Sequence, residues 1–457
     1  MPIANKIGII DKPNTDLNND LLNIKPHAES LSLFISKCDT PITIGVQGEW
    51  GSGKTSLMHL IQKDLDNKCT DENGILHVWV NAWEHSLFSD AQDILFKVLS
   101  ELMNEITPYS TSPNIGSNFK NRLKNIANST AKFASLAVVG EGAADVMSEI
   151  LDFDQNNIKK TRNELQKMTN EIVNNDKNNI GKIVVYIDDL DRINPRDAVS
   201  LLELLKNIFD IEHCVFVLAI DYEVIVKGLK EKMGSEKTND QEFRAYFDKI
   251  IQLPFMMPIG QYDIGRYVNH LLISTGFLND KQHYEEQIKD ILSYSIGGNP
   301  RSLKRLVNSL TLIDIFATLR DDVEDISEEE DLLLFSLVCL QIQFPTIYNM
   351  LVDESDFRDW DQQNTAFSIT KKKEEKEKEK FEEDFRIAQM TDEFNEEWEK
   401  ALFRVCYNKP YLKKNSTKIS KLLTFIDKKI LGDKNKEETK TWIEKVVKKT
   451  LITNVAQ

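Results

Sequence analysis

Cysteine is scarce in this sequence, and its few cysteines form no metal-binding or redox pattern. The 457-residue chain contains five of them, widely separated and without a C-x-x-C pair. Scattered thiols argue against a disulfide framework or a zinc site and are typical of a reducing compartment. Since the first residues also lack the long apolar core of a secretory signal peptide, we expect a cytoplasmic protein. The cysteines are Cys38, Cys69, Cys214, Cys339 and Cys406.

Long apolar runs are also absent, which argues against a protein embedded in a membrane. Residues 131–147 come nearest, because they are small and mostly apolar. They are fewer than the roughly 20 residues that a bilayer-spanning helix needs, and Glu141 and Asp145 interrupt them. We therefore predict a helical hairpin or a packing helix in this segment, and we expect no membrane partner.

Positively charged residues are fewer than negatively charged ones: the chain has 57 Lys and Arg residues and 73 Asp and Glu residues, for a net charge of −16. This balance argues against a surface covered by nucleic acid, but it leaves room for a local basic patch. Residues 409–449 are such a region, with thirteen lysines against five acidic residues. We expect this basic segment to contact the protein's own acidic surface; nucleic acid and an anionic surface are the alternative partners.

What the sequence does contain is a glycine-rich loop of the kind that binds phosphate. Residues 48–55 read GEWGSGKT, between an apolar run and a predicted helix, and fit the spacing G-x-x-x-x-G-K-[ST]. The glycines let backbone N–H groups turn toward a phosphate, Lys54 reaches the β- and γ-phosphates, and the Thr55 hydroxyl holds Mg²⁺. The residues predicted to bind nucleotide here are Gly48, Glu49, Trp50, Gly51, Ser52, Gly53, Lys54, Thr55 and Ser56.

Paired carboxylates stand at the end of another apolar run, residues 182–188. Asp188 closes this run and Asp189 follows it. Beside a phosphate-binding loop, the first carboxylate meets Mg²⁺ and the second orients or deprotonates the attacking water. We therefore predict Thr55 and Asp188 as Mg²⁺ ligands and Asp189 as the catalytic base. An acidic turn after a core strand would be the better interpretation if the glycine-rich loop were absent.

Strand-like and helix-like patterns alternate between residues 41 and 258, which predicts an α/β fold with a parallel sheet covered on both faces. Asp221 ends the fourth expected strand, where a polar residue that senses the γ-phosphate would lie. Capping the following helix is an equally good role for it. The expected strands are residues 42–46, 75–80, 182–188, 213–221 and 252–255.

Two arginines follow a Gly-Gly-Asn-Pro turn at residues 297–300. Pro300 fits the first turn of a helix, so Arg301 lies at the start of that helix and Arg305 one turn further on the same face. The residues alone leave two interpretations equally open: contacts to nucleotide phosphates, or a solvated basic face.

Composition divides the chain into four expected parts. A helical lead-in is followed by a nucleotide-binding core with a polar helical insertion, a helical lid, and a helical C-terminal region that contains a charged linker. Their expected ranges are residues 1–40 for the lead-in, 41–258 for the core with the insertion at 103–178, 259–320 for the lid, and 321–457 for the C-terminal region with the linker at 371–384.

The succession of motifs resembles the KAP family of phosphate-loop NTPases over about residues 20–350. The segments that carry the likeness are GEWGSGKTSL, VNAWEHS, IVVYIDDLDR, FVLAIDYEVI, YFDKIIQLPF and GGNPRSLKRLVN, in this order. The resemblance implies a sheet order of 5-1-4-3-2 and an ATPase that is often oligomeric. It implies that Arg192 and Arg301 contact phosphates, within or between subunits, and it gives Trp83, otherwise interpreted as a packing residue, a functional setting. Many members carry transmembrane helices where residues 103–178 are mostly polar here.

These observations together predict a Mg²⁺-dependent, ATP-binding NTPase. ATP rather than GTP rests on the resemblance; no N-K-x-D motif follows the acidic strand. We expect Asp189, Arg192 and Arg301 to serve catalysis, with Asp221 and Arg305 at the nucleotide. A slow nucleotide switch that couples ATP to self-assembly or to a protein partner is preferred, with phage defence as a hypothesis that the resemblance raises. The alternative is a motor stimulated by nucleic acid through the basic segment.

Overall fold

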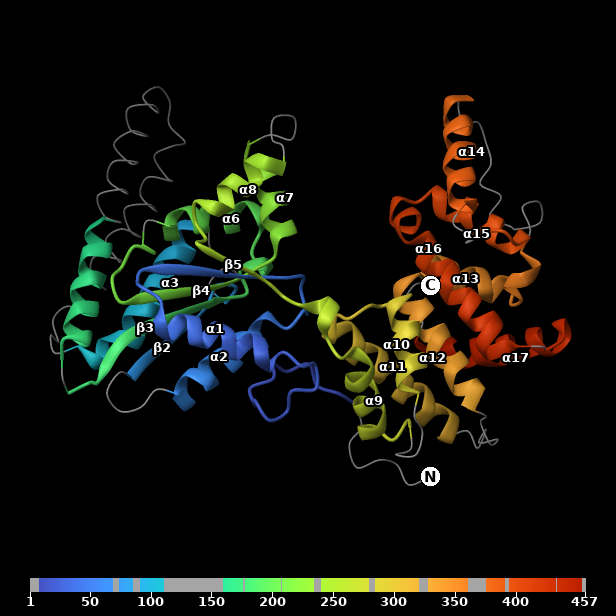
Figure 1. Ribbon diagram of the computed structural model, residues 1–457, viewed down its shortest axis with the longest axis horizontal. Helices are drawn as coiled ribbons and strands as arrows, with labels where there is room; N and C mark the ends of the chain where they lie inside the picture. The colour runs from blue at the N-terminus through green and yellow to red at the C-terminus, as the bar shows by residue number, and fades with distance from the viewer. Residues whose placement is uncertain are drawn as a thin grey trace, which may run out of the picture. The chain divides into compact units, whose positions relative to one another are not determined.

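The computed structural model describes residues 8–68, 74–84, 91–110, 159–175, 177–206, 208–233, 240–278, 284–319, 328–360, 375–390, 394–432 and 434–453. The chain divides into two compact units (Figure 1). One unit comprises Pro13–Pro258, and the other comprises Met1–Lys12 together with Ile259–Gln457. Cys69 and residues 131–147, for which a helical hairpin or a packing helix is expected, lie outside the described residues.

A five-stranded parallel sheet forms the centre of the first unit, in the order β2-β3-β4-β1-β5. This is the predicted order 5-1-4-3-2 counted from the other edge, so the predicted fold class and sheet order are confirmed. Every residue of β4 is buried, as expected for a central strand with both faces covered. The strands are β1 (Ile42–Gln47), β2 (Gly74–Asn81), β3 (Ile180–Asp188), β4 (Cys214–Ile220) and β5 (Leu253–Met256).

Helices cover both faces of this sheet (Figure 1). Alternate apolar residues of β2, β3 and β4 form one core with α3, the helical residues 159–173, α6, α7 and α8. Helices α1 and α2 pack together, and α2 contacts β2 and β4. The helices are α1 (Lys25–Lys37), α2 (Lys54–Lys68), α3 (Ala91–Ile106), α6 (Pro195–Lys206), α7 (Tyr222–Met233) and α8 (Asp240–Asp248).

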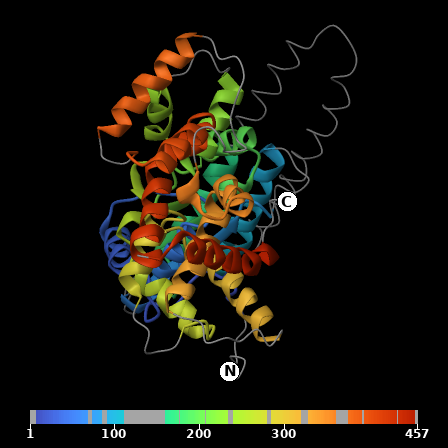
Figure 2. The ribbon, with the colours of Figure 1, turned by 90° about the vertical axis from the view of Figure 1, so that its right-hand side faces the viewer.

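The second unit consists of helices in the part of the chain that the structure describes. Helix α14 extends beyond the other helices of this unit in both views (Figures 1 and 2). Its Phe381 and Phe385 pack against Phe403 of α15. The helices are α9 (Ile264–Ser274), α10 (Glu285–Ser293), α11 (Pro300–Leu319), α12 (Glu328–Gln343), α13 (Pro345–Asp353), α14 (Glu375–Gln389), α15 (Glu397–Tyr407), α16 (Pro410–Phe425), a π-helical turn (Ile426–Leu431) and α17 (Lys436–Thr450).

The basic C-terminal segment reaches acidic residues of its own unit. Lys449 and Lys445 of α17 lie 2.7 and 3.4 Å from the buried Glu330 carboxylate of α12. Lys413 of α16 lies 2.9 Å from Asp384 of α14. The expectation that this segment contacts the chain's own acidic residues is confirmed for these three lysines.

The described residues contain neither a disulfide nor a membrane-spanning helix. Cys38, Cys214, Cys339 and Cys406 are all free thiols. Among the described residues, no helix is both long enough and apolar enough to span a bilayer.

Candidate functional site

The glycine-rich loop joins β1 to α2 and has a conformation that only its glycines allow. Gly51 and Gly53 have φ values of 84° and 101°, in the region that side-chain-bearing residues avoid. A Cβ on Gly48 would lie 2.6 Å from the Ser52 hydroxyl oxygen and 2.8 Å from a side-chain carbon of Met257. The N–H of Gly48 donates to the carbonyl of Ile220 at 3.1 Å, so the loop is fixed to the end of β4.

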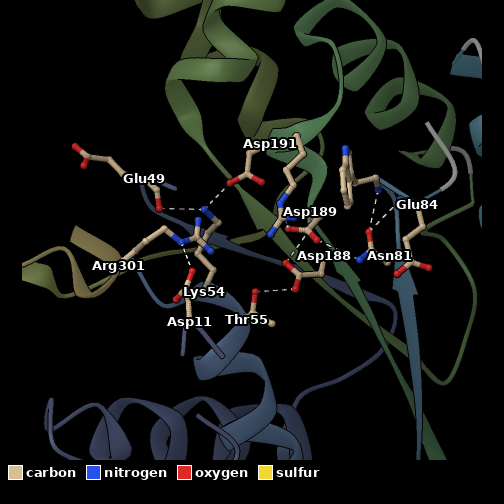
Figure 3. Close-up of polar contacts among 12 residues, drawn as sticks. Asp11, Glu49, Lys54, Thr55, Asn81, Glu84, Asp188, Asp189, Asp191 and Arg301 are labelled. Carbon is tan, nitrogen blue, oxygen red and sulfur yellow. Dashed lines mark hydrogen bonds and ion pairs between the residues drawn. The ribbon is translucent and has the colours of Figure 1, made fainter. Parts of the chain in front are cut away.

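Lys54 begins α2, and its side chain folds back under the loop. Its ammonium group donates to the carbonyl oxygens of Gly48 at 2.8 Å and Glu49 at 3.2 Å. A third contact, of 2.6 Å, joins it to the Asp191 carboxylate, as Figure 3 shows. Both side chains of this ion pair are almost completely buried, with 6% and 3% of their surface exposed. No pattern in the sequence predicts this position of Asp191.

Thr55 and Asp188, the two predicted metal ligands, lie side by side. The Thr55 hydroxyl donates to an Asp188 carboxylate oxygen at 2.7 Å (Figure 3). Asp188 is the last residue of β3, and the parallel register pairs it with Asn81 at the end of β2. A hydroxyl and one carboxylate suit Mg²⁺, which usually keeps several waters and takes further oxygens from the substrate's phosphates. The described residues hold no cluster of three His, Cys, Asp or Glu side chains that would bind a metal without a nucleotide.

Asp189 leaves the sheet in a left-handed conformation, with φ 58° and ψ 28°. Its N–H donates to Asp188 Oδ1 at 2.8 Å, and its carboxylate accepts from Asn81 Nδ2 at 3.1 Å. The other carboxylate oxygen lies 2.7 Å from Arg192 Nε. Asn81 in turn accepts from the backbone N–H groups of Trp83 and Glu84, at 3.0 and 3.3 Å. The Asn-Ala-Trp turn after β2 therefore holds Asp189 in place through Asn81 (Figure 3).

Arg192 lies near two tryptophan rings. Its guanidinium carbon is 5.1 Å from the ring centre of Trp83 and 6.0 Å from that of Trp50. Both distances are within the range of cation–π attraction. Trp50 belongs to the glycine-rich loop and is 58% exposed. Arg192 therefore contacts the loop, the turn after β2 and the predicted base at once.

Comparison with known proteins matches residues 24–316, well over half of the chain, to the model of the KAP family P-loop domain. The chain belongs to the KAP family. A relative, the phage T7 exclusion protein of Escherichia coli (strain K12), is 23% identical over 371 residues. That alignment covers 74% of this KAP protein and 47% of the relative, so the chain spans about half the relative's length.

A solved structure, that of the Aeropyrum pernix ORC1 protein in complex with DNA, also aligns with this KAP protein. The identity is 12%, the TM-score is 0.37, and the alignment covers 70% of this chain and 66% of the other. At this TM-score the likeness adds nothing to the sheet order, which the structure of the KAP protein gives directly.

Burial sets the electrostatics of the KAP site. Burial is the main cause that raises the pKa of Asp189, and the neighbouring Asp188 charge raises it further, while Arg192 and the Asn81 hydrogen bond oppose the shift. Burial likewise raises the pKa of Asp221, against a backbone hydrogen bond from Glu223 and the charge of Lys54. Both carboxylates are therefore more basic than exposed ones.

The other residues predicted to bind nucleotide make contacts within the protein or are exposed. Asp221 accepts from the N–H of Glu223 at 3.0 Å, so it makes the capping contact that was the alternative to phosphate sensing. The Ser56 hydroxyl accepts from the backbone N–H of Asn14 at 3.0 Å. Arg301 and Arg305 belong to α11 of the second unit, where Arg301 pairs with Asp11 and Arg305 is exposed. Their contact with phosphate stays a prediction.

No role for Asp191 is predicted from the sequence. For Asn81, the sequence indicates only that it is part of a segment that carries the family resemblance. Asp191 comes into contact with Lys54 because Leu190–Arg192 form a 3₁₀ turn directly after the left-handed Asp189. Asn81 lies beside Asp188 because β2 and β3 are neighbours and both strands end there. A polar residue at the carboxyl end of a neighbouring parallel strand was the signal available for Asn81.

Proposed function

We propose that this KAP protein binds ATP with Mg²⁺ and hydrolyses it slowly. The observation that carries the proposal is the 2.7 Å contact between the Thr55 hydroxyl and Asp188, at the start of the helix that follows the glycine-rich loop. These are hard oxygen ligands beside a phosphate cradle. Mg²⁺, when bound, would neutralise charge on the β- and γ-phosphates. Loop N–H groups and Lys54 would bind the phosphates themselves.

Asp189 has the surroundings of a general base in this scheme. Its raised pKa makes it a stronger base than an exposed aspartate, and Asn81 and Arg192 restrict the directions in which its carboxylate can point. We assign it to orient and deprotonate the attacking water. Arg192 and Arg301 would stabilise charge that develops on the transferring phosphoryl group, with Arg305 and Asp221 as further contacts to the nucleotide.

We further propose that ATP controls self-assembly or the binding of a protein partner, and that the biological role is exclusion of phage. The name of the Escherichia coli relative supports this role, although the two chains share 23% identity and the match covers about half of the relative. A switch needs low turnover, because the ATP-bound state has to last long enough to recruit its partner.

The test is ATP hydrolysis by the purified full chain, with Mg²⁺ or with EDTA, while light scattering follows its mass. Slow hydrolysis that requires Mg²⁺, together with a mass that rises with ATP and returns with ADP, is the expected result. Rapid turnover at constant mass would overturn the switch. Absence of both ATP binding and hydrolysis would overturn the proposed function as a whole.

A nucleic-acid-stimulated motor is the second candidate, and helix α16 favours it. This helix contains no acidic residue, and Lys414, Lys418 and Lys421 follow one another at helical spacing on its exposed surface. The motor predicts that DNA or RNA raises the hydrolysis rate, and that the stimulation falls steeply as salt increases. A rate that nucleic acid leaves unchanged at low salt would eliminate the motor.

Replacing Arg192 with glutamine is expected to move the acidic limb of the hydrolysis–pH profile to higher pH. The Arg192 charge opposes the effects that raise the pKa of Asp189, so its removal raises that pKa further. The base is then protonated, and turnover lost, at a higher pH than in the wild type. Initial rates at saturating ATP across pH would measure the shift. Arg196→Gln is the matched control, because it replaces an exposed arginine in the first turn of α6. An acidic limb that keeps its position in Arg192→Gln would contradict the assignment.

A further inference from the structure

All three N–H donors of the Lys54 ammonium group already have a hydrogen-bond partner within the protein. A lysine ammonium carries three N–H donors. In this structure the donors meet Asp191 at 2.6 Å, the Gly48 carbonyl at 2.8 Å and the Glu49 carbonyl at 3.2 Å. A phosphate oxygen can therefore reach Lys54 only if one of these partners gives way.

Asp191 is the partner that a phosphate competes with most directly. Both are anions that seek the same ammonium group, and two anions against one buried cation repel each other strongly. The two carbonyls belong to the loop itself and are fixed by its backbone, because Gly48 is tied to Ile220 and Ser52 to Glu49. The Asp191 carboxylate, by contrast, comes from the short 3₁₀ turn after β3.

We propose that Asp191 is the counter-ion of Lys54 in the nucleotide-free chain, and that it sets the affinity for nucleotides whose phosphates reach Lys54. This inference rests on the proposed function, since it concerns the same loop. Bound nucleotide replaces Asp191 as the partner of Lys54. If Lys54 is released about one tenth of the time, the pairing lowers apparent affinity about tenfold.

The pairing of Asp191 with Lys54 discriminates between nucleotides by the length of their phosphate chain. In sites of this type the lysine contacts the β- and γ-phosphates. ATP and ADP must therefore displace Asp191, whereas AMP binds without reaching Lys54. A role for Asp191 as a metal ligand predicts the opposite sign, because removal of a ligand weakens nucleotide binding when Mg²⁺ is present and changes nothing in EDTA.

The first experiment is equilibrium binding of ATP, ADP and AMP to the full chain in EDTA, for the wild type and Asp191→Asn. Asparagine keeps the shape of the side chain and removes its charge. We expect about tenfold tighter binding of ATP and ADP and unchanged binding of AMP. Asp197→Asn is the matched control, because it removes the same charge from the first turn of the following helix, α6. Unchanged or weaker ATP binding in Asp191→Asn would overturn the inference.

The second experiment needs no nucleotide and uses thermal melting of Lys54→Met, Asp191→Asn and the double variant. Each single change leaves one buried charge without its partner, so each is expected to lower the melting temperature. The double variant removes both charges and is expected to melt above either single variant. If the decrease in melting temperature of the double variant equalled the sum of the two single decreases, Lys54 and Asp191 would not be paired. If the wild type binds no nucleotide but this coupling is present, the proposed function fails while the ion pair stands.

Discussion

Replacing Lys54 with alanine is expected to weaken ATP binding by at least about 100-fold, because it removes charge-assisted hydrogen bonds to two phosphates. Lys54 is the one cationic side chain of the glycine-rich loop, and its ammonium group lies under the loop between the Gly48 and Glu49 carbonyls. The loop N–H groups alone would still contact phosphate, but without a full positive charge. Isothermal titration calorimetry with ATP in the presence of Mg²⁺ measures the loss of affinity.

Lys63→Ala is the matched control for this variant, because Lys63 is an exposed lysine on the same helix, α2. Lys54→Ala also leaves the buried Asp191 carboxylate without its partner, and breaking a buried ion pair typically destabilises a protein by about 3–5 kcal/mol. Titration has to be made below the melting temperature of the variant, checked by circular dichroism. Wild-type affinity in a folded Lys54→Ala protein would show that the glycine-rich loop does not bind the nucleotide.

The same variant tests the proposed role in cells. If ATP binding controls exclusion of phage, plaque formation on cells that produce Lys54→Ala equals that on cells without the protein, while Lys63→Ala protects as well as the wild type. Equal protection by both variants, at equal protein level, would separate the role in defence from the nucleotide site.

Much of the fold and part of the site could be predicted because they depend on local patterns. Apolar runs indicated the positions of all five strands, and the parallel arrangement brings Thr55 and Asp188 together at one edge of the sheet. Loop glycines such as Gly53, with φ 101°, have a physical reason that can be read from their spacing alone.

The remaining contacts depend on geometry that no periodicity encodes. Three aspartates lie within four residues, yet each has a different partner: Asp188 meets Thr55, Asp189 meets Arg192, and Asp191 meets Lys54. The left-handed backbone at Asp189 decides this division, because it turns the chain before the 3₁₀ turn begins. A pattern of alternating residues predicts where a strand ends, but not the direction of the side chains beyond its end.

Because each of the three aspartates has a different partner, Asp189→Asn tests the catalytic base separately from the other two. Its expected effect on turnover is the second large one. We expect turnover to fall by about 10²- to 10⁴-fold, the usual contribution of a general base, while ATP affinity stays within about a factor of two of the wild type. Asparagine tolerates the left-handed conformation that Asp189 adopts and can still accept a hydrogen bond from Asn81, so the fold of the turn is preserved. Single-turnover hydrolysis measures the chemical step separately from product release.

Two variants make this test specific to Asp189. Glu84→Gln removes a charge from the Asn-Ala-Trp turn, and it is expected to leave the rate unchanged, because only the backbone N–H of Glu84 takes part in the contacts to Asn81. Asp191→Asn removes the neighbouring carboxylate that faces Lys54. If Asp191→Asn stopped turnover and Asp189→Asn did not, the base would be Asp191, and the Asp189–Arg192 pair would serve to hold the turn. A loss confined to Asp189→Asn instead assigns the base to the carboxylate that Asn81 and Arg192 fix in place.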